Sequence, residues 1–233
     1  MIIVKKLFLN GKQVKIVSDS VVLDLTAPGR AIFSVISETA ESGSLTEYHV
    51  GTDGTAALWF SGYAESCRRI DRQQVRLVVR EYSAILARRW PLAQRNTSAR
   101  RVLGELNSKT GIAFRLGVSS TSWADTPIAY FINTGNGYEI LDLIGKHLKI
   151  KDYVWLNQPD GSVFIGSGSE LAGADKILVF PESFFTNLSG TGADCPCLPA
   201  LRPGRRLRIG NTEAVRIETI TLQGEMMRLG FQC

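Results

Sequence analysis

Short runs of alternating hydrophobic and polar residues fill roughly the first ninety positions of the chain. Residues 2–9 and 12–17 flank Asn10-Gly11, the dipeptide most typical of a two-residue hairpin turn. Further runs of the same kind, such as residues 75–80, are separated by turn residues. Many short strands at close spacing are typical of a barrel or a sandwich. We therefore predict an N-terminal β-barrel domain over residues 1–92.

In the middle of the chain, hydrophobic residues no longer recur at every second position but at the three-to-four-residue spacing of a helix. Asn96-Thr97-Ser98 can cap a helix that runs to about Lys109, and Gly111 stands where a helix-ending glycine belongs. The apolar faces of this helix and of a second one starting near Asn136 consist of Val102, Leu103, Leu106, Tyr138, Leu141, Ile144 and Leu148. With a strand between the helices and a hairpin around Asp160-Gly161, residues 93–175 read as a small α+β module.

The alternating pattern returns toward the C-terminus. Residues 206–209, 214–222 and 225–231 are strand candidates, while 186–199 is rich in Gly, Ser, Asp and Pro and reads as a loop or an extended crossing. Residues 176–233 are thus predicted as a C-terminal β-barrel domain. The predicted fold class is α+β, mainly β, with two β-barrel-like domains bracketing a small α+β module.

The composition of the chain excludes few classes of function. Hydrophobic residues make up 44% of the chain, charged residues make up 21%, and the formal net charge is +5. A mildly basic chain suits acidic protein partners as well as nucleic acid. No apolar run approaches the length of a membrane span, so we expect no membrane partner.

Candidates for catalysis are few. His49 and His147 lie far apart in the sequence, one in a predicted strand and one late in a predicted helix. The motifs of nucleophilic hydrolases, zinc proteases and phosphate-binding loops are absent from the sequence. We therefore predict a protein that is not an enzyme, with no catalytic, cofactor-binding or metal-binding residues and no cofactor.

Four cysteines leave one chemical alternative open. Cys67, Cys195, Cys197 and Cys233 together offer four thiolates for zinc or an iron–sulfur cluster. Their spacing matches no common metal motif, which favours unrelated free thiols in a reducing compartment.

Two arginine clusters raise the alternative of a nucleic-acid-binding β-barrel protein. The clusters comprise Arg68, Arg69, Arg72, Arg76 and Arg80, and Arg202, Arg205, Arg206 and Arg208. Nucleic-acid readers interleave such residues with exposed aromatic side chains. Here the nearby aromatics, including Trp59 and Trp90, read as core or interface residues, so a solvated or inter-subunit surface is favoured.

Taken in order, these elements resemble the baseplate hub family of tailed bacteriophages, which includes late control proteins and tail proteins of Mu-like phages. The first stretch that carries the resemblance is residues 59–63, followed by the basic strand 75–80 and the exit 86–89. The second is the helix 97–111 with the helix 137–148 and the hairpin around Asp160-Gly161. The third is residues 198–204, which pair a Leu-Pro with an Arg-Pro-Gly before the closing strands.

The resemblance implies a structural role in a virion. It implies a homotrimeric ring in which each chain supplies two barrels, so that six barrels match a sixfold tail tube and the trimer matches a spike or fibre. The implied partners are tube or distal tail proteins on one side and a spike or fibre on the other. Assembly would take place in the host cytoplasm, and DNA could pass transiently through the ring.

Overall fold

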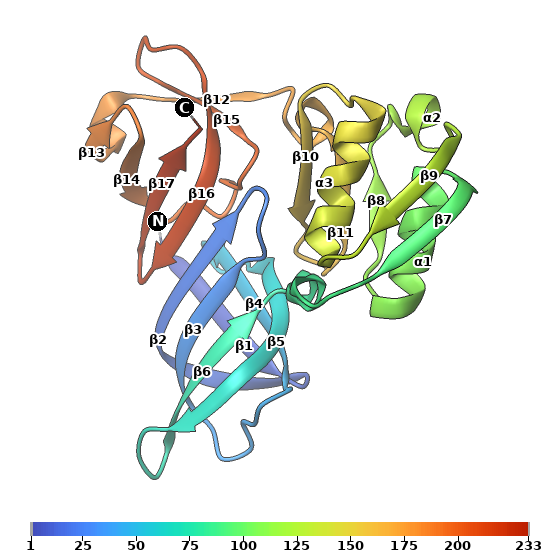
Figure 1. Ribbon diagram of the computed structural model, residues 1–233. Coiled ribbons are helices and arrows are strands. Elements are labelled where there is room, and N and C mark those ends of the chain that lie inside the picture. Colours follow the sequence, from blue (N-terminus) through green and yellow to red (C-terminus); the bar gives the residue numbers. More distant parts are fainter. Residues whose placement is uncertain (1, 233) are drawn as a thin grey trace. The chain divides into compact units, whose positions relative to one another are not determined.

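A computed structural model describes residues 2–232 of the 233-residue chain (Figure 1). The chain forms two compact units. The first unit combines Met1–Tyr82 with Lys176–Cys233, and the second unit is Ser83–Asp175. The N-terminal and C-terminal β regions therefore share one unit, and the chain leaves the first unit ten residues before the expected boundary at residue 92. The division into three domains stays a prediction, because one compact unit can hold more than one domain.

Six strands of the first unit close into a barrel. They are β1 (Ile3–Leu9), β2 (Lys12–Asp24), β3 (Arg30–Ile36), β4 (Leu45–Thr52), β5 (Ala57–Arg69) and β6 (Gln74–Arg80). All neighbours are antiparallel, in the order β1-β4-β5-β6-β3-β2, and β1 pairs with β2 to complete the ring. The hairpin predicted at Asn10-Gly11 is confirmed: both residues have positive φ, 48° and 78°, as a tight two-residue turn requires.

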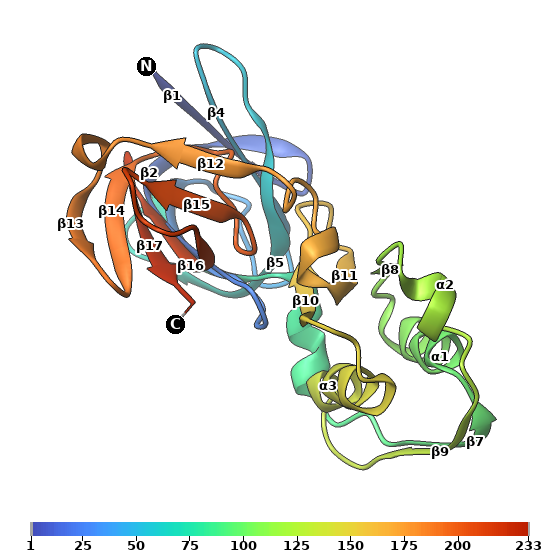
Figure 2. The ribbon, with the colours of Figure 1, turned by 90° about the horizontal axis from the view of Figure 1, so that it is seen from above.

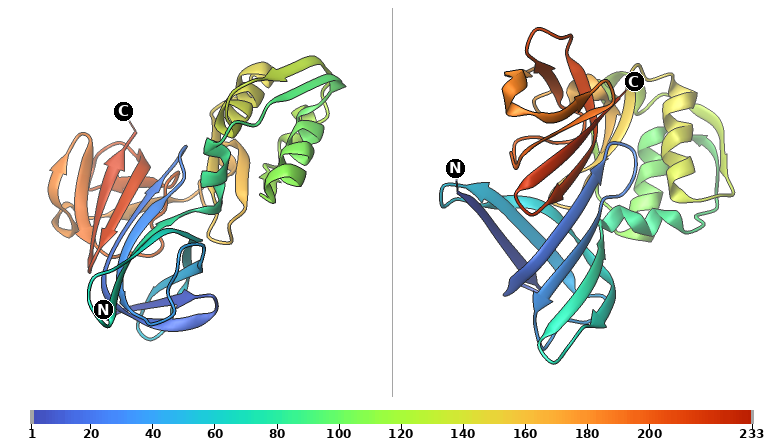
Figure 3. Two further views of the ribbon diagram at one scale, coloured as in Figure 1. Left: turned by 60° about the horizontal axis from the view of Figure 1, so that its bottom comes forward. Right: turned by 90° about the vertical axis from the view of Figure 1, so that its left-hand side faces the viewer.

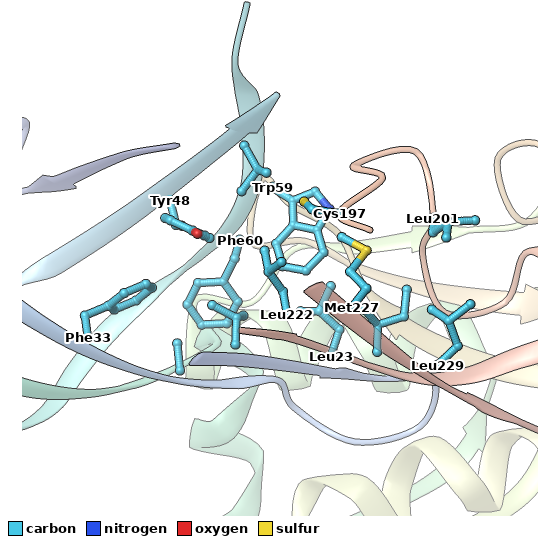
Figure 4. Packing of buried hydrophobic residues seen from close by; sticks show 14 of the residues in the cluster. Leu23, Phe33, Tyr48, Trp59, Phe60, Cys197, Leu201, Leu222, Met227 and Leu229 are labelled. Atoms are coloured by element: carbon cyan, nitrogen blue, oxygen red, sulfur yellow. The ribbon is translucent and has the colours of Figure 1, made fainter. Parts of the chain in front are cut away.

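Large apolar side chains fill the barrel (Figure 4). Phe33, Tyr48 and Phe60 are fully buried, and the ring centroids of Phe33 and Tyr48 lie 5.1 Å apart. They point inward because alternate residues of each strand face the interior, as the burial pattern of β3 shows. The same apolar cluster includes Leu222, Met227 and other residues of the C-terminal strands, so the first unit has one continuous core.

The C-terminal strands extend the barrel's sheet (Figure 2). They are β12 (Ile177–Phe180), β13 (Thr186–Ser189), β14 (Gly192–Pro196), β15 (Arg206–Ile209), β16 (Val215–Gln223) and β17 (Met226–Phe231). β16 pairs with β2 of the barrel, and the strands order as β12-β15-β16-β17-β14-β13. Residues 186–199, expected as a loop or crossing, contain the strands β13 and β14. β13 pairs with β14, and β14 pairs in turn with β17 along Gly192–Pro196.

The second unit contains the helices. Its elements are η1 (Tyr82–Ala87, which begins at the boundary), β7 (Leu92–Thr97), α1 (Ala99–Thr110), β8 (Phe114–Leu116), α2 (Ser120–Trp123), β9 (Ile128–Asn133), α3 (Gly137–Leu148), β10 (Tyr153–Asn157), β11 (Val163–Ser167) and η2 (Gly168–Glu170). The short helical turn η3 (Glu182–Phe184) belongs to the first unit. β10, β11 and β8 form one small sheet, and β7 and β9 form a two-stranded ribbon.

Both predicted helices are confirmed with their caps. α1 begins after Ser98 and ends at Gly111, whose φ of 76° is the left-handed conformation that favours glycine. α3 begins after Asn136, whose side chain accepts a hydrogen bond from the backbone N–H of Glu139 at 3.0 Å. The mainly β character with a small α+β part is thereby confirmed. None of the helices within residues 2–232 is long and apolar enough to cross a membrane.

Gly104 offers a test of helix propensity in α1. A Cβ atom added there meets nothing within 4 Å, and the residue is exposed. Gly104→Ala is therefore expected to raise the free energy of unfolding of the second unit by about 1 kcal/mol, because alanine has the higher helix propensity. Urea denaturation followed by circular dichroism measures the change. Gly145→Ala in α3 is the matched control and should destabilise, since its Cβ would lie 2.4 Å from the ring of Tyr153.

Candidate functional site

The two histidines lie in different units. His49 lies in β4 of the first unit, where its ring packs edge-on against Phe8 with centroids 5.1 Å apart. His147 lies in the last turn of α3 in the second unit. Within residues 2–232, no three or more His, Cys, Asp or Glu side chains are placed to hold a metal ion.

The Cys195 and Cys197 thiols are core groups. Both side chains are fully buried and both thiols are free. Cys195 lies in β14 and Cys197 directly follows that strand, and residues two apart in an extended chain face the same side. Burial raises the pKa of Cys195 to about 12 and that of Cys197 to about 11. Cys67 is only half-buried and contacts the carbonyl oxygen of Ala40 at 3.2 Å. The four-thiolate alternative also needs Cys233, which lies outside the described residues.

Thiol labelling tests this assignment. Iodoacetamide at neutral pH is expected to leave Cys195 and Cys197 unmodified in the folded protein, because only the exposed thiolate reacts. Both should become labelled in about 6 M guanidinium chloride, which unfolds typical domains. Peptide mass mapping reads each cysteine separately. Rapid native labelling of Cys195 would contradict the buried assignment.

A buried polar cluster, formed by Gly29, Trp59, Glu81 and Arg202, joins the barrel to the C-terminal region. The guanidinium of Arg202 lies over the Trp59 ring, 5.2 Å from its centroid, and donates to the Trp59 carbonyl oxygen. In return, the indole N–H of Trp59 donates to the carbonyl oxygen of Pro199 at 3.1 Å. Arg202 thus belongs to the interior contact and not to the surface arginine cluster in which the sequence placed it.

Glu81 is the buried acidic member of this cluster. It is only 4% exposed, and its carboxylate accepts a hydrogen bond of 2.5 Å from the backbone N–H of Gly29. Burial raises the pKa of Glu81 to about 7, although the Gly29 hydrogen bond and the Arg202 charge act in the opposite direction. The charge of Asp24 also raises the pKa.

A second polar network closes the gap between β1 and β2. These strands pair only near their turn, from Leu7↔Val14 to Leu9↔Lys12, and they diverge beyond it (Figure 3, right). The Lys5 ammonium bridges the divergence by an ion pair of 2.6 Å with Asp19, which also accepts a hydrogen bond from the Tyr48 hydroxyl at 3.0 Å. Lys5 also donates to the carbonyl oxygen of Gly224 in the β16–β17 turn. The open end of the barrel is thereby tied to the C-terminal hairpin.

Two strands of the first unit have unpaired edges. Among the described residues, β12 pairs only with β15, and β13 pairs only with β14, so each presents one unpaired edge. β12 carries the apolar sequence Ile-Leu-Val-Phe, and Val179 is 62% exposed. An unpaired apolar edge is a hazard in an isolated chain and a ready contact in an assembly.

The second unit has an apolar ribbon face of its own. Tyr130 and Ile132 of β9 are 61% and 64% exposed, although neighbouring residues of this strand are buried. The Arg95 guanidinium of β7 lies 5.6 Å from the centroid of the Tyr130 ring. Neither ribbon strand was among the elements predicted from the sequence. The apolar, aromatic-containing run Ile-Ala-Tyr-Phe-Ile at residues 128–132 was a signal that could have identified β9.

The first arginine cluster follows two paired strands. Arg68 of β5 is the cross-strand partner of Arg76 of β6, and Arg80 forms an ion pair of 3.2 Å with Glu65. In the second cluster, Arg206 and Arg208 are exposed on β15. The aromatic residue expected in the core, Trp59, is buried there. The arginines form a basic strand face: β6 and β15 contain no aromatic residue, whereas Tyr63 of β5 is the cross-strand partner of Arg80.

Similarity to known proteins points in one direction. No protein-family model matches the chain. An uncharacterized 58.7 kDa protein of Haemophilus phage HP1 is 28% identical over 225 residues, which cover 97% of this chain and 41% of that protein. The chain therefore spans about two fifths of the length of this relative.

The fold matches two solved structures of tail proteins. The 43 kDa tail protein of prophage MuSo2 from Shewanella oneidensis superposes with a TM-score of 0.70 at 11% identity, covering 98% of this chain and 97% of that one. The tail protein of Neisseria meningitidis MC58 gives 0.72 at 11% identity, with coverage of 98% and 96%. The resemblance seen in the sequence is thus confirmed at the level of the fold.

Proposed function

We propose that this chain is a structural, non-enzymatic subunit of a phage-type tail, at the hub that joins the tail tube to a central spike or fibre. The observation that carries the proposal is the fold match to two tail proteins, one of them from a prophage, over almost the whole of each chain. The HP1 phage protein adds support at the level of sequence.

The proposal includes a ring of three copies. Each chain contributes the closed six-stranded barrel and the curved group β12–β17, which we take as a second barrel-like module of six strands. Three chains then present six similar modules to a sixfold tube and three equivalent faces to a spike. The unpaired edges of β12 and β13 support this reading, because such edges can pair between subunits and a head-to-tail contact can close into a ring.

The partners follow from the same proposal. A tube or distal tail protein would bind one face of the ring, and a spike or fibre would bind the other. The subunit would belong to the tail of a virion, which is assembled in the cytoplasm of the host bacterium. DNA would pass through the ring transiently, which requires that the basic strand faces do not hold it tightly.

Mass in solution tests the ring. Light scattering coupled to gel filtration is expected to give three times the 25.6 kDa mass of one chain. Val179→Lys, on the exposed β12 edge, should shift the distribution toward the monomer, because a charge on an edge opposes pairing. Lys176→Ala, immediately before β12, is the control.

The alternative, a nucleic-acid-binding β-barrel protein, predicts a different result. A monomer whose affinity for duplex DNA falls steeply with salt would replace the hub proposal by this alternative. A trimer that is indifferent to DNA would exclude the alternative.

A further inference from the structure

A cavity in the second unit lies outside everything used so far. It has a volume of about 530 Å³ and lies between α2, the C-terminal end of α3 and the segment after β11. This is within the size range of small-molecule sites. Five hydroxyl groups line it, those of Ser119, Ser122, Thr126, Ser167 and Ser169.

Two lysines lie at one side of the cavity. Lys149 and Lys151 line it beside His147, and all three side chains are exposed. Neither lysine forms an ion pair with another of the described residues 2–232. An acidic group of a ligand would therefore meet two ammonium groups that have no carboxylate partner of their own.

A fixed carboxylate lines the same cavity. Glu170 accepts hydrogen bonds from the backbone N–H of Ser119 at 2.6 Å, from the Ser119 hydroxyl at 3.1 Å and from the backbone N–H of Ser167 at 3.2 Å. These donors hold the carboxylate in place. Because an ionised carboxylate has about four acceptor positions, it can also accept a hydrogen bond from a ligand hydroxyl.

This combination of groups defines a class of ligand. A bare phosphate would be attracted by the lysines but repelled by Glu170. A neutral sugar would satisfy Glu170 and the serine hydroxyls but leave the lysines unused. We propose that the cavity binds an anionic saccharide, a ring with several hydroxyl groups and one phosphate or carboxylate substituent. This inference goes beyond the hub proposal and does not depend on it.

Each polar group of such a saccharide would have a partner in the cavity. Ring hydroxyls would donate to Glu170 and exchange hydrogen bonds with Ser122 and Ser169. The acidic substituent would lie toward Lys149 and Lys151, where charge-assisted hydrogen bonds are stronger than neutral ones. Trp123 also lines the cavity, and its indole N–H is already bonded to the Ser119 hydroxyl at 3.3 Å.

Calorimetric titration of the full chain tests the proposal. The probes are glucose 6-phosphate, glucuronate, glucose, inorganic phosphate and a thymidine oligonucleotide. Saturable binding is expected for glucose 6-phosphate or glucuronate, at least about tenfold tighter than for glucose or phosphate. Which of the two binds more tightly identifies the acidic substituent.

Matched variants locate the site. Lys149→Ala combined with Lys151→Ala should weaken binding by at least about tenfold, since both charge-assisted contacts are lost. Lys146→Ala changes an exposed lysine in the last turn of α3 that does not line the cavity, and it should leave the affinity unchanged. All three positions are exposed, so the variants should fold.

Four results would overturn the proposal. They are the absence of saturable binding by either anionic sugar, phosphate binding as tightly as glucose 6-phosphate, an equal loss in the Lys146→Ala control, and tighter binding of the oligonucleotide than of either sugar. The last result would instead assign the lysines to nucleic acid.

Discussion

Trp59→Ala is expected to lower the free energy of unfolding of the first unit by about 3–5 kcal/mol, the range for a large buried aromatic side chain. The indole is only 3% exposed and belongs to the core cluster that the barrel shares with the C-terminal strands. The substitution leaves a cavity, removes the hydrogen bond to Pro199 and takes away the ring on which Arg202 lies. The effect should therefore reach both β regions, which unfold together.

Urea denaturation monitored by far-ultraviolet circular dichroism measures this loss. Trp59→Phe is the milder variant: it keeps an aromatic ring but loses the indole N–H, and we expect a cost of about 1–2 kcal/mol, on the scale of one hydrogen bond with its orphaned acceptor. Arg206→Ala, an exposed arginine on β15, is the surface control and should change stability by less than about 0.5 kcal/mol. A small effect of Trp59→Ala would show that the cluster does not hold the two β regions together.

Glu81→Gln is expected to remove a pH dependence of several kcal/mol. The carboxyl of Glu81 has a pKa of about 7 in the folded protein, above its ordinary value of 4.5. Between these two values the folded state binds the proton more tightly than the unfolded state, so the free energy of unfolding decreases as the pH rises. At about 1.4 kcal/mol for each pKa unit, the contribution of Glu81 amounts to roughly 3 kcal/mol, fully lost above pH 7.

Glutamine retains an oxygen that can accept the Gly29 N–H but cannot ionise. The variant should therefore match the parent near pH 4.5 and exceed its stability near pH 8. Denaturation curves collected at several pH values measure the difference. Glu65→Gln, which removes a half-exposed carboxylate paired with Arg80, is the control and should leave the pH dependence of the parent in place. If the stability of the parent and of Glu81→Gln changed with pH in the same way, the raised pKa of the buried Glu81 carboxyl would be contradicted.

The local elements of this protein could be predicted from its sequence. Asn10-Gly11 defined the first hairpin because both positions need positive φ, and the capping residues Ser98, Gly111 and Asn136 marked the helices, since their signals are contained in a few neighbouring residues. The absence of a catalytic motif was also visible from the residues alone. The barrel strands followed from alternation, a property of each strand by itself.

Only the tertiary structure decided how these elements are joined. The pairing of β16 with β2 links residues about 200 positions apart, and no local pattern encodes such a partner. For the same reason, Arg202 looked like part of a basic surface until the fold laid it on Trp59, and Glu81 looked like an ordinary acidic residue until Gly29 and the core enclosed it. The cavity beside α2 likewise combines three segments that are separate in the chain. The sequence determined which elements form, whereas their pairing and burial depend on contacts between distant residues.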